Sequence, residues 1–140
     1  MNANPKLTAE QENELVASAK RASAHAYAPY SNFHVGAAIL LETGETFSGC
    51  NVENASYGLT NCAERSAIFA AVSALGRVRV RAVAVVNDRN LACSPCGACR
   101  QVIAEFGPEA QVFYRGPNGI QSSSIRDLLP HCFSSESLAE

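Results

Sequence analysis

The sequence has neither a long apolar run nor a surplus of basic residues, and each absence narrows what the chain can do. Its longest apolar stretches, such as residues 37–41, are far shorter than the roughly 20 residues that a membrane-spanning helix requires. Lysine and arginine number 11 against 13 aspartate and glutamate residues, so the basic surface that binds a phosphate backbone is missing. The first 11 residues are polar and contain no apolar signal-peptide segment. We therefore expect a cytoplasmic protein with no membrane partner and no nucleic-acid polymer partner.

The length and the cysteine content limit the architecture further. A chain of 140 residues that is 47% hydrophobic has the size of one ordinary domain, and it contains no internal repeat or low-complexity tract. We expect one domain over residues 1–140, with a frayed tail at 134–140. Six cysteines in an unexported chain are better explained by metal ligation and buried thiols than by disulfides.

Hydrophobic periodicity and turn residues predict alternating helices and strands. Thr8 and Gln11 form a capping-box pattern before a helix that runs to about residue 26. Gly76 is expected to end a second helix, because glycine is common just after the last helical turn. The later elements complete an α/β layered domain with a mixed sheet. The expected segments are a hairpin of 34–41 and 46–52, a helix at 61–75, a strand at 78–87, a helix at 96–106, a strand at 111–114 and a helical turn at 125–129.

Three arginines alternate at positions 77, 79 and 81, at the start of the expected strand 78–87. Alternate residues of a strand point to one face of a sheet. We interpret this pattern as the solvated or interface face of an edge strand, in preference to a track for nucleic acid.

Two short motifs 34 residues apart carry the chemistry: Cys62-Ala63-Glu64 and Pro95-Cys96-Gly97-Ala98-Cys99. Three thiolates would hold Zn²⁺ and leave the fourth tetrahedral position for water, whereas a structural site fills all four positions with side chains. Water bound to such an ion has its pKa lowered to roughly 7, and Glu64 is placed to carry its proton. Both motifs are expected to open helices, where free N–H groups favour thiolates.

Other interpretations of these motifs stay open. Asn61 and Glu64 have the spacing of a helix N-cap pair, in which the carboxylate only satisfies backbone donors. Cys93, Cys96 and Cys99 resemble part of an iron–sulfur run, but the fourth cysteine is absent at the expected spacing. Four cysteines including Cys93 could also form a closed zinc site in a non-catalytic binding module. We favour Cys93 as a non-ligand, because it precedes Pro95 and lies outside the expected helix.

The remaining cysteines and two arginines lie around the expected donor set. Arg65 is expected to donate to a ligand sulfur and offset the negative charge of three thiolates on one zinc ion. The sequence leaves the role of Arg100 undecided. Cys50 and Cys132 are expected to be buried core residues, because most cysteines are.

Longer stretches around these motifs resemble the small, homotetrameric class of zinc-dependent cytidine deaminases. The resemblance covers roughly residues 15–133, and the zinc deaminases as a group use a histidine or cysteine, two further cysteines and a non-ligating glutamate. Here Cys62 stands at the position where other members have histidine. The segments that carry the resemblance are Asn51-Val52-Glu53-Asn54-Ala55, Thr60-Asn61-Cys62-Ala63-Glu64-Arg65 and Ser94-Pro95-Cys96-Gly97-Ala98-Cys99-Arg100-Gln101.

The resemblance implies a fold, a reaction and a set of site residues. The fold would be a three-layer α/β/α domain with a mixed sheet of about five strands. The reaction would be hydrolytic deamination of cytidine and deoxycytidine in pyrimidine salvage, with one Zn²⁺ per subunit and hydroxide attacking C4. The implied residues are the zinc ligands Cys62, Cys96 and Cys99, the proton shuttle Glu64, the ribose-binding Asn51 and Glu53, the pocket residues Phe33 and Tyr57, the base-binding amide of Ala63, and Phe133 closing a neighbouring subunit's pocket.

The ribose segment also has a physical argument of its own. Asn51 and Glu53 lie two residues apart at the end of an expected strand, so their side chains point to the same side and could hold vicinal hydroxyls. Ordinary turn chemistry is the competing explanation. The alternatives to a nucleoside deaminase are a blasticidin S-type deaminase and the non-catalytic module stapled by metal on four cysteines.

Overall fold

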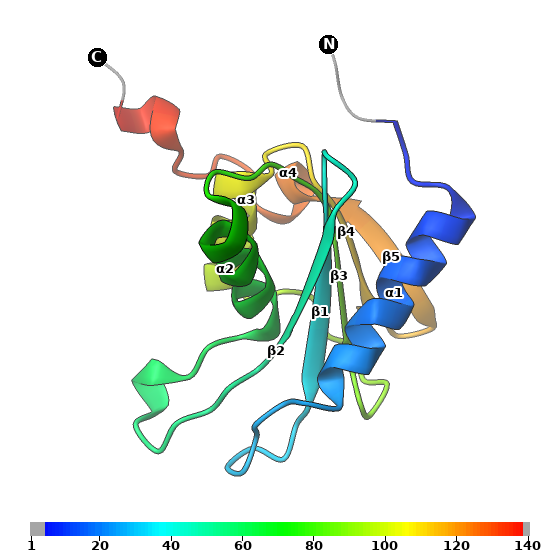
Figure 1. Ribbon diagram of the computed structural model, residues 1–140, viewed down its shortest axis with the longest axis vertical. Coiled ribbons are helices and arrows are strands. Elements are labelled where there is room, and N and C mark those ends of the chain that lie inside the picture. Colours follow the sequence, from blue (N-terminus) through cyan, green and yellow to red (C-terminus); the bar gives the residue numbers. More distant parts are fainter. Residues whose placement is uncertain (1–4, 139–140) are drawn as a thin grey trace.

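The computed structural model describes residues 5–138 as a mixed sheet with helices on both faces (Figure 1). The sheet has five strands in the order β2-β1-β3-β4-β5, which confirms the predicted three-layer α/β/α class. The helices are α1 (Ala9–Ser23), α2 (Ala63–Leu75), α3 (Gly97–Phe106) and α4 (Ile125–Leu128), with 3-10 turns η1 (Tyr57–Leu59) and η2 (Ser135–Leu138). The strands are β1 (Val35–Leu41), β2 (Thr46–Cys50), β3 (Val80–Asn87), β4 (Gln111–Gly116) and β5 (Gly119–Ser124).

Helix α1 begins as its sequence predicts. The Thr8 side chain accepts from the Gln11 amide, and the Gln11 side chain accepts from the Thr8 amide, so the capping box is complete. Leu15, Ala19 and Ala22 are buried along one face. The helix ends at Ser23, three residues before the predicted end.

The two faces of the sheet carry separate apolar clusters, which explains the three layers. Alternate residues of β1 divide between them, since Ala38 and Leu40 pack under α1 while Ile39 and Leu41 pack toward α2 and α3. β1 pairs antiparallel with both β2 and β3, and β3 pairs parallel with β4. The crossover between the parallel strands β3 and β4 carries α3 onto the face of the sheet that α2 also covers.

The structure corrects the interpretation of the arginine pattern. Arg77 and Arg79 precede β3, and β3 is the middle strand of the sheet, so no edge strand carries these residues. Only Arg81 lies within β3, and its side chain donates to the Pro5 carbonyl at 3.0 Å. The β-branched residues that predicted this strand lie in β3, which is hydrogen-bonded to β1 on one side and to β4 on the other.

The segment-by-segment prediction missed β5. Residues 119–124 read Gly-Ile-Gln-Ser-Ser-Ser, and they form a strand because each one pairs antiparallel with β4. The tail expected to be frayed includes the short turn η2, while residues 139–140 lie outside the described residues. Across residues 5–138, the helices are all too short or too polar to traverse a lipid bilayer.

Candidate active site

A small ladder of three segments brings the distant motifs together. Val52 forms an antiparallel bridge with Asn61, with N–H to carbonyl distances of 2.9 Å in both directions. On its other side, Val52 forms a parallel bridge with Tyr27. Residues 51–53 therefore lie between the segment of Tyr27 on one side and Asn61, the residue before Cys62, on the other.

Three thiols form the centre of the site. Cys62 is the N-cap of α2, Cys96 is the N-cap of α3 and Cys99 is the third residue of α3. Their sulfur atoms all lie within 4.8 Å of one another. Thiolates bound tetrahedrally to one zinc at about 2.3 Å are about 3.8 Å apart, so small adjustments would fit the ion. Cys99 is buried and Cys96 is exposed, which leaves the cluster open on one side.

Hydrogen bonding within the cluster gives the Cys62 and Cys99 thiols different pKa values. Donation from Cys99, opposed by burial and assisted by Arg65, lowers the pKa of Cys62 to about 5. The same hydrogen bond, together with burial, raises the pKa of Cys99. The cluster thus already favours a thiolate at Cys62, and a metal ion would displace the proton held by Cys99.

Arg65 lies where the sequence predicted it. Its Nη2 atom donates to the Cys62 sulfur at 3.1 Å, and this bond raises the pKa of the guanidinium above its ordinary value. The arginine therefore supplies positive charge next to the Cys62 sulfur.

Glu64 is the buried carboxyl group beside the thiols, with 5% of its surface exposed. Burial raises its pKa, and the negative charge of Cys62 adds to the effect, while hydrogen bonding from Cys99 opposes it. Asn61 is not the N-cap, because Cys62 holds that position and Asn61 instead donates to the Ser66 hydroxyl, although the Glu64 carboxyl group does accept from its own backbone amide. A buried carboxyl group therefore lies at the cluster of thiols.

Arg100 has a structural role that the sequence left open. It donates to the Pro95 carbonyl at 2.7 Å, the Leu128 carbonyl at 2.8 Å and the Ser94 hydroxyl at 2.9 Å. These bonds fasten the segment before α3 to the end of α4. Arg100 therefore supports the backbone that carries Cys96.

Cys93 does not belong to the cluster of sulfurs within 4.8 Å, as favoured from the sequence. Its backbone N–H donates to the Arg115 carbonyl at 2.8 Å, which places it in a bridge beside β4. Cys50 and Cys132 also lie outside this cluster, as expected, but both are only half-buried and so are not the buried core residues that the sequence predicted.

Asn51 connects the ladder to the start of β1. It is 8% exposed, and its Oδ1 accepts from the Val35 amide at 2.9 Å. Its Nδ2 donates to the Phe33 carbonyl at 2.8 Å. The turn-chemistry explanation is thus partly correct for Asn51, although one donor and one acceptor position remain on its carboxamide.

Glu53 holds the loop before Phe33. Its Oε1 accepts from the Tyr30 amide at 3.0 Å and the Ser31 amide at 3.1 Å, and its Oε2 accepts from the Ser31 hydroxyl. The Ser31 hydroxyl bond is the main cause of a lowered pKa of Glu53, so this group is ionised. The Ser31 oxygen in turn accepts from the Phe33 amide at 3.0 Å.

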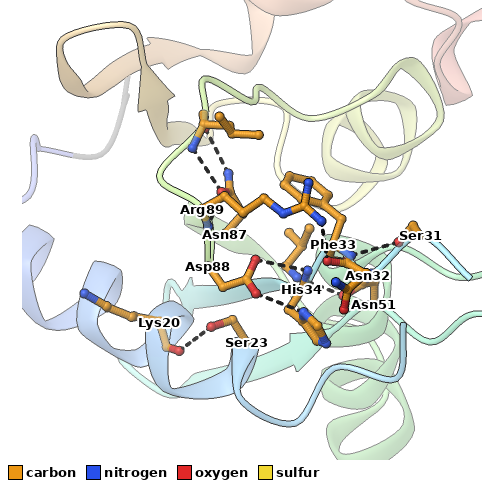
Figure 2. Close-up of polar contacts among 12 residues, drawn as sticks. Lys20, Ser23, Ser31, Asn32, Phe33, His34, Asn51, Asn87, Asp88 and Arg89 are labelled. Atoms are coloured by element: carbon orange, nitrogen blue, oxygen red, sulfur yellow. Dashed lines mark hydrogen bonds and ion pairs between the residues drawn. The ribbon is translucent and has the colours of Figure 1, made fainter. Parts of the chain in front are cut away.

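A further residue, Arg89, contacts this region and was missed in the sequence. Its guanidinium lies over the Phe33 ring, 5.6 Å from the centroid, and its Nη2 donates to the Asn32 carbonyl at 2.7 Å (Figure 2). No local motif marks Arg89. It reaches Phe33 because the end of β3 pairs with the start of β1.

The other predicted site residues divide into one buried residue and two exposed ones. Ala63 is fully buried as the first residue of α2. Tyr57 is 75% exposed on η1 and makes an edge contact with Tyr30, with ring centroids 6.1 Å apart. Phe133 is 60% exposed, and its carbonyl accepts from the Gln101 side chain at 2.8 Å. Within one chain, neither exposed ring is enclosed.

Comparisons with known proteins agree with this geometry. The family model described as "Cytidine and deoxycytidylate deaminase zinc-binding region" matches residues 9–115. The chain is 49% identical over 128 residues to a cytidine deaminase of Sporosarcina psychrophila, covering 90% of this chain and 93% of that protein. A crystal structure of cytidine deaminase from Burkholderia pseudomallei aligns with a TM-score of 0.80 at 49% identity, covering 86% of this chain and 98% of that one. A blasticidin-S deaminase of Bacillus cereus is 36% identical over 104 residues, with 69% and 74% coverage.

Proposed function

Because the chain belongs to the cytidine and deoxycytidylate deaminase family, we propose that it hydrolyses cytidine and deoxycytidine to uridine and deoxyuridine, releasing ammonia. One observation carries this proposal. Cys62, Cys96 and Cys99 present three sulfurs within 4.8 Å of one another, and the buried carboxyl group of Glu64 lies beside them. Three ligands with an adjacent acid–base group are what a hydrolytic zinc site requires.

The three cysteines would hold one zinc ion per subunit. When bound, zinc supplies Lewis acidity, which makes water a nucleophile at neutral pH. Three thiolates leave one net negative charge on the ion, and the hydrogen bond from Arg65 to Cys62 partly offsets it. The N-termini of α2 and α3 add partial positive charge at the same place.

Glu64 would move the protons of the reaction. Its carboxylate would accept a proton from the attacking water and deliver it to ring N3, and would then carry the other proton of that water from the new C4 hydroxyl to the departing amine. Burial raises the pKa of Glu64, which suits a group that must both accept and release protons near neutral pH. Overall, one water adds across C4 and N3 and one ammonia leaves.

Asn51 and Glu53 would bind the ribose hydroxyls beside Phe33. The free positions on their side chains support this role. An ionised carboxylate offers about four acceptor positions, and the bonds from Tyr30 and Ser31 occupy three of those on Glu53. A sugar hydroxyl can therefore be accommodated without breaking the loop.

The buried backbone amide of Ala63 would donate to the base carbonyl, since it lies at the free N-terminus of α2. Tyr57 and Phe133 would complete the pocket, with Phe133 reaching the site of a neighbouring subunit in a homotetramer. Their exposure in one chain supports this arrangement. We further propose one domain over residues 1–140, a cytoplasmic location and a role in pyrimidine salvage.

Ammonia release tests the proposal. The zinc-loaded protein is incubated with cytidine, deoxycytidine, cytidine monophosphate, free cytosine and blasticidin S. We expect turnover of the two nucleosides alone. Glu64→Gln should keep full zinc content and lose at least about 10²-fold in kcat, because it removes general acid–base catalysis. Glu105→Gln, an isosteric change at an exposed glutamate of α3, is the matched control and should leave kcat unchanged.

Two outcomes would contradict the proposal. Turnover of none of the five compounds at full zinc occupancy would favour the non-catalytic metal-binding module. Turnover of blasticidin S in preference to the nucleosides would reassign the substrate and leave the reaction class in place.

A further inference from the structure

The loop after β3 meets the loop before β1 at the ring of Phe33. Two hydrogen bonds hold the Phe33 backbone. Its N–H donates to the Ser31 hydroxyl, and its carbonyl accepts from the Asn51 side chain. The ring itself is contacted by Arg89, whose guanidinium lies 5.6 Å from the centroid. Figure 2 shows Arg89 spanning from the ring to the Asn32 carbonyl. Backbone and ring are thus fixed by different partners.

Both loops carry an asparagine in the left-handed region at this junction. Asn32 has a φ of 57° and Asn90 has a φ of 53°. Such conformations are uncommon for non-glycine residues and persist where surrounding contacts specify them. The Arg89 side chain connects the two loops, since it donates to the Asn32 carbonyl at 2.7 Å.

The Arg89 backbone is also held in place. The buried Asn87 side chain accepts from the Arg89 amide and the Leu91 amide, both at 3.0 Å, and donates to the Leu91 carbonyl at 2.9 Å. The Asp88 carboxylate pairs with the Nδ1 atom of His34, the residue after Phe33, at 2.9 Å. The guanidinium is therefore presented from a loop with a defined geometry.

We propose that Arg89 is a positioning residue for nucleoside binding, which fixes the ring of Phe33 and the carbonyl of Asn32 so that the pocket wall is preformed. This inference rests on the proposed function, since it assigns Phe33 to the nucleoside pocket. Arg89 acts through Phe33, and within residues 5–138 its guanidinium contacts Phe33 and Asn32 and makes no hydrogen bond to the three cysteines. Its contribution is to binding, and the chemical step is left to the zinc cluster and Glu64.

Arg89→Ala should raise KM for cytidine about three- to tenfold and leave kcat within about twofold. That range follows from losing one exposed cation–π contact and one hydrogen bond that preorganise the site. A mutation that removes ground-state and transition-state binding equally changes KM alone. Arg89→Lys keeps a cation for the ring but loses the planar guanidinium, so its KM should lie between those of the wild type and Arg89→Ala.

Arg79→Ala is the matched control. Arg79 is an exposed arginine just before β3, whereas Arg89 follows the same strand, so the two variants make the same charge change at opposite ends of it. Cytidine carries no charge, and long-range attraction therefore cannot explain a difference between the variants. We expect Arg79→Ala to have the wild-type KM.

A double-mutant cycle with Phe33→Leu separates positioning from a general structural effect. If Arg89 acts through the ring, Arg89→Ala should change KM by less than about twofold in the Phe33→Leu background, giving a clear coupling term. An equal rise in both backgrounds, a fall in kcat at constant KM, or an unchanged KM in Arg89→Ala would overturn the role of Arg89. Absence of turnover by the wild-type protein would overturn the proposed function and this inference together, so the two failures are distinguishable.

Discussion

Gly49 on β2 is where an added methyl group should disturb the zinc cluster from a distance. A Cβ atom at Gly49 would lie 2.5 Å from the Ala67 nitrogen and 2.9 Å from the Ala63 carbonyl oxygen of α2. Both are backbone atoms, so no side chain can rotate away. To restore a separation of 3.0 Å from the nearer atom, α2 must move from the sheet by about 0.5 Å.

That displacement would act on the metal site because α2 carries Cys62 and Glu64, whereas Cys96 and Cys99 belong to α3. Metal–ligand distances tolerate only about 0.2 Å of change. We expect Gly49→Ala to weaken zinc binding about tenfold or more, the range of loss that follows when the groups that orient metal ligands are mutated. Overpacking should also lower the free energy of unfolding of the metal-free protein by about 1–3 kcal/mol.

Two further glycines provide the controls. A Cβ atom at Gly36 would lie 1.9 Å from the Ala19 carbonyl of α1, which carries none of the three cysteines. Gly36→Ala should therefore destabilise the protein at least as much while zinc affinity per folded molecule stays unchanged. Gly58 has nothing within 4 Å of an added Cβ, so Gly58→Ala should be neutral or slightly stabilising, by about 0.4–1 kcal/mol.

The assay compares zinc affinity, from competition with a coloured chelator, with urea unfolding of the metal-free proteins. The reasoning would be refuted if Gly49→Ala lost stability but kept the zinc affinity of the wild type. It would also fail if Gly36→Ala lost zinc affinity to the same extent, because general destabilisation would then explain both.

Two other substitutions test the supports of the cluster. Arg65→Ala should raise the pKa of Cys62 above about 5, because it removes one of the groups that lower it, so protons should displace zinc at a higher pH than in the wild type; a zinc-release titration against pH would contradict this if the midpoint did not rise. Arg100→Ala should lower the free energy of unfolding by about 1–3 kcal/mol, since it leaves three oxygen acceptors without their partner. Denaturant unfolding measures that loss, and Arg126→Ala, which removes an exposed arginine from α4, is the control with an expected change of less than about 1 kcal/mol.

Much of the site could be predicted from local sequence because its ligands follow local rules. Cys96 and Cys99 are three residues apart at a helix start, so any helix there places both thiols on one side. Cys62 opens the other helix, and the charged Arg65 lies one turn away from it. The capping box of α1 and the apolar face of that helix likewise need only nearby residues.

The sequence could not supply features that depend on which strands are neighbours. β5 is polar and serine-rich, and it is a strand only because β4 offers an unpaired edge. The arginines at positions 77 and 79 looked like part of an edge strand, yet β3 became the centre of the sheet through pairing with β1 and β4.

The sequence by itself determined the donor set, the helix starts that present it and the type of reaction such a set performs. The tertiary structure alone decided that Arg89 lies over Phe33, that Arg100 fastens the segment before α3, and that Gly49 contacts the backbone of α2. The physical reason is that residues within one helix turn have fixed spacing, whereas residues 56 positions apart, such as Phe33 and Arg89, meet only when strand register has been set by packing of the whole sheet.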